Sequence, residues 1–267
     1  MQLMAKNPPS IQEEISPKYF GKKICVLANT GNAGKTTIAT YLLHPRMNAK
    51  IFSVETRNRS SKDLGVSEAD VAVYKGNEFG KLLEDIIFED TVIIDVGTSN
   101  IDAFFHDMEK YQNAFSEFDM IIIPVVAEEK SDKEAVHLIR ELSSFSLSPS
   151  RLFFLPNRIP LGQSPKALLP NLYQEIETEK QATVFEDCFI QETEIFEFLS
   201  KSGLSLESLI KNGGENGELY RSQGRDAQKQ GLKEKQLTYA SLYRWHRLAT
   251  PIKEKLDFVF DRIVSLM

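Results

Sequence analysis

The sequence contains only two cysteines, Cys25 and Cys188, in 267 residues. Cysteines so far apart match neither the disulfide framework of a small secreted protein nor the close spacing of metal ligands. The four histidines are equally scattered, and no Gly-x-Ser-x-Gly elbow is present for a nucleophilic serine. These absences argue against the disulfide-rich, zinc-binding and serine-hydrolase classes. They favour a reducing compartment, for which we expect the cytoplasm.

Long hydrophobic runs and an excess of positive charge are also missing. The longest apolar run, residues 120–127, is far shorter than the roughly 20 residues that span a bilayer. Residues 1–19 lack the apolar core of a signal peptide. The net charge of −6 argues against a protein coated in nucleic acid. We therefore expect no transmembrane segment. At 267 residues and 42% hydrophobic, the chain can bury a full core as one α/β domain with extra helices, or as a domain plus a small appendage.

Apolar runs of strand length alternate with helical patterns over the first 160 residues. Strands are predicted at residues 23–28, 50–54, 71–74, 91–96, 120–125 and 151–156, with a further short one at 182–185. Helices are predicted at residues 35–43, 78–88, 101–113 and 133–145. Several strands are apolar at consecutive positions, which is typical of parallel strands covered on both faces. The pattern predicts a doubly wound, mostly parallel α/β sheet with helices on both faces.

After Pro160 the strand rhythm gives way to short helical segments, and residues 213–217 indicate a loop or flexible joint. We expect the last helix to begin at Pro251, a favoured first-turn residue. It carries an apolar stripe at helical spacing, formed by Ile252, Leu256, Val259 and Ile263. We predict a polar N-terminal extension (1–20), a phosphate-loop domain (21–210) and a helical C-terminal extension (211–267) that packs on it. A dimer contact is the alternative for the stripe.

The most informative segment is an apolar strand that leads into Asn-Thr-Gly-Asn-Ala-Gly-Lys-Thr-Thr at residues 29–37. A strand, a glycine-containing loop and a Gly-Lys-Thr helix start predict a phosphate-binding loop (P-loop), in which amides and the helix dipole converge on phosphate oxygens. Lys35 is placed to reach the β and γ phosphates and Thr36 to ligate Mg²⁺. The expected nucleotide-binding residues of the loop are Thr30, Gly31, Asn32, Ala33, Gly34, Lys35, Thr36 and Thr37.

The loop is an incomplete match, because Asn29 stands where the pattern G-x-x-x-x-G-K-[ST] has its first glycine. A glycine-containing turn with a chance Lys-Thr is the alternative. We expect Lys35 to lie in a solvent-accessible loop, so that replacing it removes nucleotide binding and spares the fold.

Three further residues are expected near the same phosphates. Asp95 ends an apolar strand, where its carboxylate would lie beside Mg²⁺. Gly97 follows in Asp-Val-Gly and would let its amide approach the γ-phosphate, unless it is only a strand-end turn. Glu55 ends the second strand and is placed to position the attacking water, unless it faces solvent. We predict Lys35, Glu55 and Asp95 as catalytic residues, and Thr36 and Asp95 as metal ligands.

The sequence also bears on the choice of base. GTP-binding switches commonly read guanine with Asn-Lys-x-Asp, but the strand expected at 151–156 is followed by Asn-Arg-Ile-Pro, which lacks the Asp. Asn157 can still pair with the amino group and a ring nitrogen of adenine. We therefore expect ATP and ADP to bind in preference to GTP.

These motifs resemble those of a known family. Residues 28–37 resemble the deviant phosphate loop of the ParA/MinD ATPases, whose usual form is Lys-Gly-Gly-x-Gly-Lys-Thr-Thr. The Gly-Asn-Ala-Gly-Lys-Thr-Thr core is similar to that of the StbB plasmid-stability proteins. So are Leu-Leu-His-Pro-Arg-Met at 42–47, Glu-Thr-Arg-Asn at 55–58 and Asp-Val-Gly-Thr-Ser-Asn at 95–100. The resemblance is strong over about residues 22–101, fair to about 160 and weak beyond.

The resemblance implies an ATP-dependent switch that acts in plasmid stability, partition or conjugative transfer beside a plasmid DNA-binding protein. ParA/MinD relatives typically form homodimers with nucleotide between the subunits, and each subunit contributes a signature lysine to the other's phosphates. Thr30 stands at the position of that lysine here, and Asn32 at that of the second glycine.

Two functions are therefore open. The leading one is a slow Mg²⁺-dependent ATPase that times an interaction, which Glu55 and Asp95 favour. The alternative is an adaptor that binds ATP or ADP with little or no hydrolysis, which Thr30 favours. A kinase for a small metabolite would need an arginine-rich lid, and no compact Arg-rich segment precedes residue 160. Residues 211–247 carry eight basic and four acidic side chains, a local charge of +4 that leaves direct DNA contact open.

Overall fold

The computed structural model describes residues 21–55, 70–75, 77–111 and 114–267. The predicted N-terminal extension (1–20) and residues 56–58 of one family motif lie outside these ranges. Among the described helices, none combines the length and the apolar character needed to cross a membrane.

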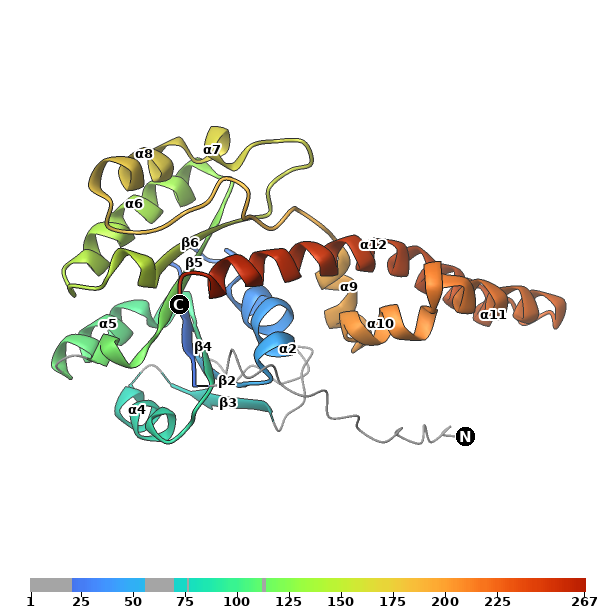
Figure 1. Cartoon of the computed structure of the whole chain (residues 1–267). Helices are drawn as coiled ribbons and strands as arrows, with labels where there is room; N and C mark the ends of the chain where they lie inside the picture. The colour runs from blue at the N-terminus through green and yellow to red at the C-terminus, as the bar shows by residue number, and fades with distance from the viewer. Residues whose placement is uncertain (1–20, 56–69, 76, 112–113) are drawn as a thin grey trace.

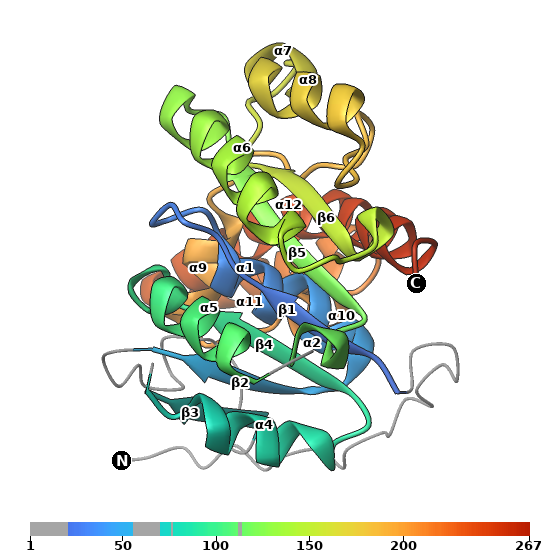
Figure 2. The same cartoon turned by 90° about the vertical axis from the view of Figure 1, so that its left-hand side faces the viewer.

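Six parallel strands form one sheet in the order β3-β2-β4-β1-β5-β6. The strands are β1 Lys23–Val26, β2 Lys50–Val54, β3 Val71–Tyr74, β4 Val92–Val96, β5 Met120–Val126 and β6 Leu152–Asn157. The chain proceeds from β1 outward to β2 and β3 on one side, and after β4 it crosses to β5 and β6 on the other (Figure 2). This confirms the predicted doubly wound sheet, whose ligand crevice lies at the carboxyl ends of the central strands.

The short strand predicted at residues 182–185 is wrong. Only one isolated bridge joins Thr183 to Phe153 of β6. Thr183 N donates to the carbonyl of Leu152, and Phe154 N donates to that of Thr183, each over 2.8 Å. Backbone pairing therefore reaches a single residue, and the sheet ends at β6.

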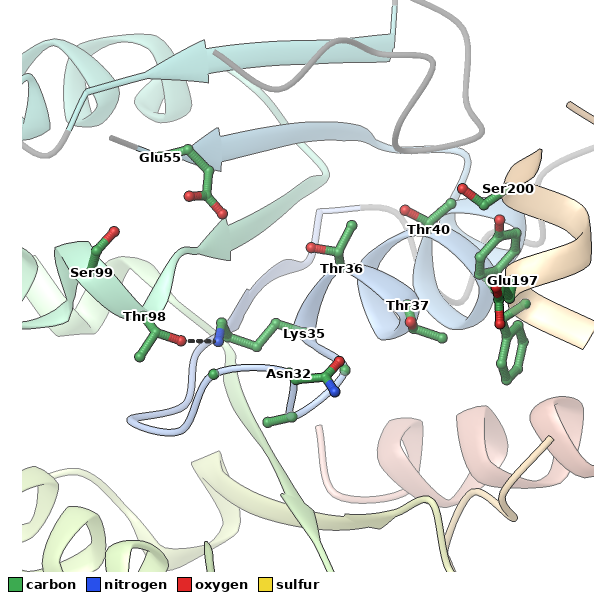
Figure 3. A pocket seen from close by; sticks show the side chains of 15 residues that line it. Asn32, Lys35, Thr36, Thr37, Thr40, Glu55, Thr98, Ser99, Glu197 and Ser200 are labelled. Atoms are coloured by element: carbon green, nitrogen blue, oxygen red, sulfur yellow. Dashed lines mark hydrogen bonds between the residues drawn. The ribbon is translucent and has the colours of Figure 1, made fainter. Parts of the chain in front are cut away.

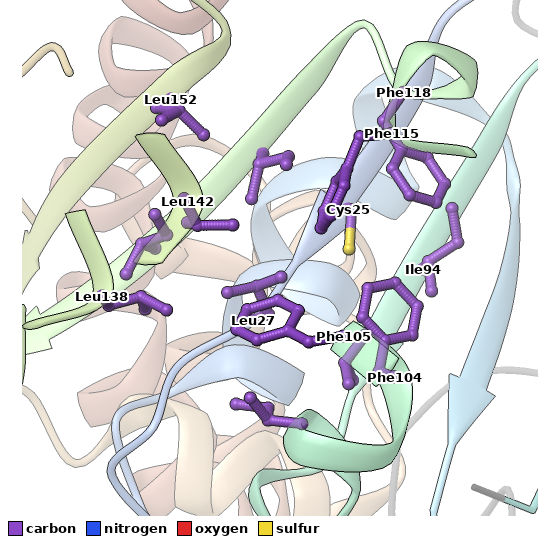
Figure 4. Close-up of a cluster of buried hydrophobic side chains, with 14 of the residues drawn as sticks. Cys25, Leu27, Ile94, Phe104, Phe105, Phe115, Phe118, Leu138, Leu142 and Leu152 are labelled. Atoms are coloured by element: carbon purple, nitrogen blue, oxygen red, sulfur yellow. The ribbon is translucent and has the colours of Figure 1, made fainter. Parts of the chain in front are cut away.

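Helices cover both faces of the sheet, because successive side chains of each central strand point to opposite faces. Cys25 and Leu27 enter a core shared with α4 (Phe79–Ile87), α5 (Ile101–Lys110), α6 (Glu129–Ser143) and α8 (Pro170–Glu179). Figure 4 shows Cys25 and Leu27 among Phe104, Phe105, Phe115 and Phe118. Ile24 and Val26 enter a second core, which includes side chains from the C-terminal helices. Both cysteines are buried and free.

The helix after the P-loop is continuous but irregular. It comprises α1 (Lys35–Thr37), the π-helical segment η2 (Ile38–Leu43) and α2 (His44–Met47). Pro45 lacks the N–H that would close an α-turn on Tyr41, whose carbonyl accepts instead from Nη1 of Arg46 at 3.0 Å. Arg46 also binds Oδ1 of Asp257 through Nε (2.9 Å) and Nη2 (2.6 Å). The P-loop helix is thereby tied to the C-terminal helix.

The C-terminal region is helical, with α9 Ile195–Ser202, α10 Leu206–Gly213, α11 Glu218–Lys229 and α12 Lys233–Val264, after the short α7 Pro165–Leu168. Figure 1 shows α11 and the first half of α12 projecting together from the body of the molecule. The predicted helix start at Pro251 is wrong, because Pro251 lies inside α12. A proline inside a helix costs about 3 kcal/mol. In α12, buried residues lie on both sides of the proline. Trp245 and Ala249 precede Pro251, and Leu256 and Val259 follow it.

The apolar stripe of the last helix packs within the chain. Leu256, Val259 and Ile263 lie in the second core, with Ile252 against it. The loop predicted at residues 213–217 is closely packed: Gly213 ends α10, Glu215–Gly217 form one 3-10 turn, and a Cβ added at Gly213 would lie 2.2 Å from the ring of His246. The boundary at residue 210 stays a prediction, and α10 runs across it.

Candidate nucleotide-binding site

The P-loop leaves β1 and enters α1 in the conformation that its sequence allows. Gly34 has a φ of 95°, in the left-handed region that glycine occupies without strain. Asn32 has a φ of 60°, and asparagine is one of the few other residues that tolerate this region. The asparagine at the position of the family's second glycine is therefore compatible with a left-handed loop.

Lys35 is buried, with 8% of its surface exposed, so the expectation of a solvent-accessible lysine is wrong. Its Nζ lies 2.6 Å from Oγ1 of Thr98 and 3.4 Å from the carbonyl oxygens of Ala28 and Thr30 (Figure 3). As the first residue of α1, it folds back over its own loop. To bind phosphate, the ammonium group of Lys35 would have to replace these oxygen partners with phosphate oxygens.

Thr36 and Asp95 meet where β1 and β4 end side by side. Oγ1 of Thr36 donates to Oδ2 of Asp95 over 2.8 Å, and Asp95 is 1% exposed. A hydroxyl and a carboxylate are hard oxygen donors of the kind that Mg²⁺ prefers. In the described ranges no cluster of three or more His, Cys, Asp or Glu side chains could hold a metal alone. The donor set therefore fits a Mg²⁺ ion that is completed by phosphate oxygens and water.

Glu55 and Gly97 lie against each other. A Cβ added at Gly97 would lie 2.5 Å from Oε2 of Glu55, so this carboxylate occupies the space that a larger residue would take. The amide of Gly97 donates to the carbonyl of Val54 over 2.9 Å. Thr98, the partner of Lys35, comes next in the chain. Sequence reasoning did not single out Thr98, which appeared only inside a family motif.

Asn157 supports the loop from behind. It is 3% exposed, its Nδ2 donates to the carbonyl of Ala33 over 2.8 Å, and its Oδ1 accepts from the amide of Arg158 over 2.9 Å. A Cβ added at Gly34 would lie 2.1 Å from Nδ2. Both ends of the amide are thus engaged by protein, so pairing with adenine would require Asn157 to release the loop.

A cavity of about 810 Å³ opens in front of the loop (Figure 3). Its walls are the loop, the segment after β4 and one face of α9. The lining residues are Gly31, Asn32, Ala33, Gly34, Lys35, Thr36, Thr37, Thr40, Tyr41, Glu55, Thr98, Ser99, Phe196, Glu197 and Ser200. Most of the predicted site residues are therefore brought together.

Four predicted residues do not line this cavity. Three of them contact a lining residue instead. Asp95 is hydrogen-bonded to Thr36, Gly97 lies against Glu55, and Asn157 lies against Gly34. Oγ1 of Thr30 lies 3.5 Å from Oγ of Ser131 in α6, on another side of the loop. No sequence motif marks the α9 residues, which are about 160 positions from the loop.

No protein-family model and no curated protein matches the chain. Solved structures that resemble the chain include the following three. Apo McdA of Cyanothece has 17% identity and a TM-score of 0.47, over 70% of this chain and 92% of that one. The cell division ATPase MinD of Pyrococcus furiosus has 16% identity and a TM-score of 0.48, over 84% and 98%. A ParA family ATPase from Chlorobium tepidum TLS has 13% identity and a TM-score of 0.42, over 69% and 90%.

Proposed function

We propose that the protein is a nucleotide-binding switch that takes ATP and ADP with Mg²⁺. The observation that carries this proposal is the loop at residues 29–37, with its left-handed turn at Gly34 and with Lys35 and Thr36 opening a helix beside Asp95. Backbone amides and a helix N-terminus facing a cavity form a site for phosphate. The size of the cavity, about 810 Å³, is sufficient for a nucleoside triphosphate.

The residues take distinct roles in this proposal. Lys35 leaves Thr98 and neutralises the β and γ phosphates, while Thr36 and Asp95 hold Mg²⁺, which offsets phosphate charge. Glu55, next to Gly97, positions the attacking water. Because Thr98 holds Lys35 in this structure, phosphate binding and the position of the segment after Gly97 are coupled.

The sequence resemblance supports a role in plasmid stability, partition or conjugative transfer, in the cytoplasm and beside a plasmid DNA-binding protein. We propose slow ATP hydrolysis as the timing step. The adaptor function, with binding but little turnover, is the second candidate, because Thr30 lacks the charge of the signature lysine and its hydroxyl lies near Ser131. The helical region 211–267 would act as an extension of the phosphate-loop domain.

ATP turnover and self-association, measured in the same sample with and without Mg²⁺, test this proposal. A switch ATPase predicts slow turnover that stops on chelation of Mg²⁺ and an assembly state that differs between ATP and ADP. An adaptor predicts nucleotide binding without turnover. A protein that binds neither ATP nor ADP would overturn both functions.

A further inference from the structure

The cavity has two chemically different ends. At the loop end, Lys35 and the amides at the start of α1 favour negative charge. At the other end, α9 contributes Phe196, Glu197 and Ser200 to the lining, and Figure 3 shows Glu197 and Ser200 on the side of the P-loop helix that carries Thr40. The carboxylate disfavours phosphate, the aromatic ring favours a flat apolar group, and the hydroxyl can donate or accept a hydrogen bond, so this end suits a neutral group that carries hydrogen-bond donors.

The carboxylate at this end is ionised. Lys201, one turn further along α9, donates a hydrogen bond to Glu197 and holds the pKa of Glu197 below its ordinary value. An ionised carboxylate accepts hydrogen bonds and donates none. Its natural partners in a nucleotide are therefore donors, namely the ribose hydroxyls and the N–H groups of the base.

Two hydroxyls on the P-loop helix lack partners. Thr40 is 2% and Tyr41 8% exposed, and within the described part of the chain neither hydroxyl has a hydrogen-bond partner. A buried polar group left unpaired is destabilising, so such groups are uncommon without a reason. Both residues line the cavity at its α9 end. Burial raises the pKa of Tyr41 to about 12, which keeps its proton available for donation.

An aromatic platform lies at the same place. The rings of Tyr41 and Phe196 are stacked with centroids 5.2 Å apart, and Phe196 is only partly buried. Tyr41 follows Thr37 by four residues in the same continuous helix, and both residues line the cavity. The platform therefore lies further from the phosphate loop than Thr37 does.

We propose that the nucleoside half of the bound nucleotide lies between the P-loop helix and α9, with its base against Phe196 and Tyr41 and its polar groups on Thr40, Glu197 and Ser200. This rests on the proposed function, because the phosphates must occupy the loop. It assigns recognition of the nucleoside to α9 and leaves Asn157 as a support of the loop. The ligand class is a purine nucleoside triphosphate or diphosphate.

The test compares ligands that share phosphates but differ in the nucleoside. The dissociation constants of ATP, GTP and inorganic tripolyphosphate are measured by calorimetry, with Mg²⁺, for the wild type, Phe196→Ala and Ser200→Gln. Ser200→Gln fills the subsite from a partly exposed helix position, so it tests the proposal if Phe196→Ala folds poorly. Phe88→Ala is the matched control, because Phe88 is 88% exposed and lies outside the cavity.

We expect both variants to bind ATP at least tenfold more weakly, in line with the loss of base stacking, and to bind tripolyphosphate within twofold of the wild type. Phe88→Ala should match the wild type for every ligand. Unchanged ATP affinity in both variants would overturn the subsite, and so would equal losses for ATP and tripolyphosphate. A wild type that binds neither ligand would instead overturn the phosphate-loop function itself.

Discussion

Replacing Asn157 with alanine distinguishes two roles for this residue, stabilising the P-loop and binding the nucleotide base. The substitution removes the donor to the Ala33 carbonyl and the acceptor for the Arg158 amide, at 2.8 and 2.9 Å. Asn157 is 3% exposed, so water does not readily replace these bonds. A typical hydrogen bond contributes about 1 kcal/mol, and a buried group left unpaired costs about 1–3 kcal/mol. We therefore expect a loss of about 2–4 kcal/mol of unfolding free energy.

The effect on binding follows from where those bonds lie. The Ala33 carbonyl belongs to the loop, which the phosphates require in one conformation, so each ligand must then order the loop as it binds. An ordering cost of about 1.4 kcal/mol corresponds to tenfold weaker binding. We expect ATP, GTP and tripolyphosphate to weaken by about the same factor in Asn157→Ala. Asn212→Ala, at an exposed asparagine of α10, should change none of them.

Chemical denaturation gives the stability change, and calorimetry gives the three affinities. If Asn157 reads adenine, as the sequence alone suggested, only ATP should weaken, and tripolyphosphate should bind as it does to the wild type. That result would refute the role of Asn157 as a loop support.

Three further substitutions test separate parts of the account. Asp95→Ala should weaken ATP when Mg²⁺ is present and much less after chelation, since Asp95 acts through the metal; an equal defect in both conditions would show a structural role. Thr30→Lys should strengthen ATP-dependent dimerisation or raise turnover if the subunits pair across their nucleotides, because a lysine–phosphate contact is strong when desolvated; sedimentation with ATP, with ADP and without nucleotide checks this, and no association in any condition favours a monomeric adaptor. Asp257→Asn should reduce stability near neutral pH by no more than about 1 kcal/mol, since Asp257 is 42% exposed. Burial raises the pKa of Asp257, but Lys253 and Arg46 outweigh it and hold that pKa below its ordinary value, so the difference from wild type in denaturant melts should vanish as the pH falls below about 4.

The sheet could be predicted from the sequence because its strands are short, apolar and buried on both faces. Val92, Ile93 and Ile94 show this, since all three are fully buried. The phosphate-loop motif could be predicted because its residues are contiguous, from β1 to Thr37. The continuous helix through Pro251 could not be predicted. Local propensity favours proline at a helix start, and only the burial of residues on both sides of Pro251 allows one continuous helix.

The candidate site could be predicted only in part, for a related reason. Lys35 lines the cavity, but the sequence does not show that its ammonium group contacts Thr98, which is 63 positions away. The amide of Asn157 has two possible uses, and only the fold shows that Ala33 and Arg158 occupy it. The α9 wall has no motif, because a stacking ring and a hydroxyl are common on any helix. The sequence alone therefore does not reveal the contacts between residues that lie far apart in the chain.

The affinity of ATP for Lys35→Ala, compared with the wild type in the presence of Mg²⁺, tests the central claim most directly. The control is Lys81→Ala, at an exposed lysine of α4, and circular dichroism checks that each variant is folded. We predict at least 100-fold weaker ATP binding in Lys35→Ala, because a full positive charge facing the phosphates is lost, and unchanged binding in Lys81→Ala. A folded Lys35→Ala that binds ATP as tightly as the wild type would contradict the assignment of the P-loop.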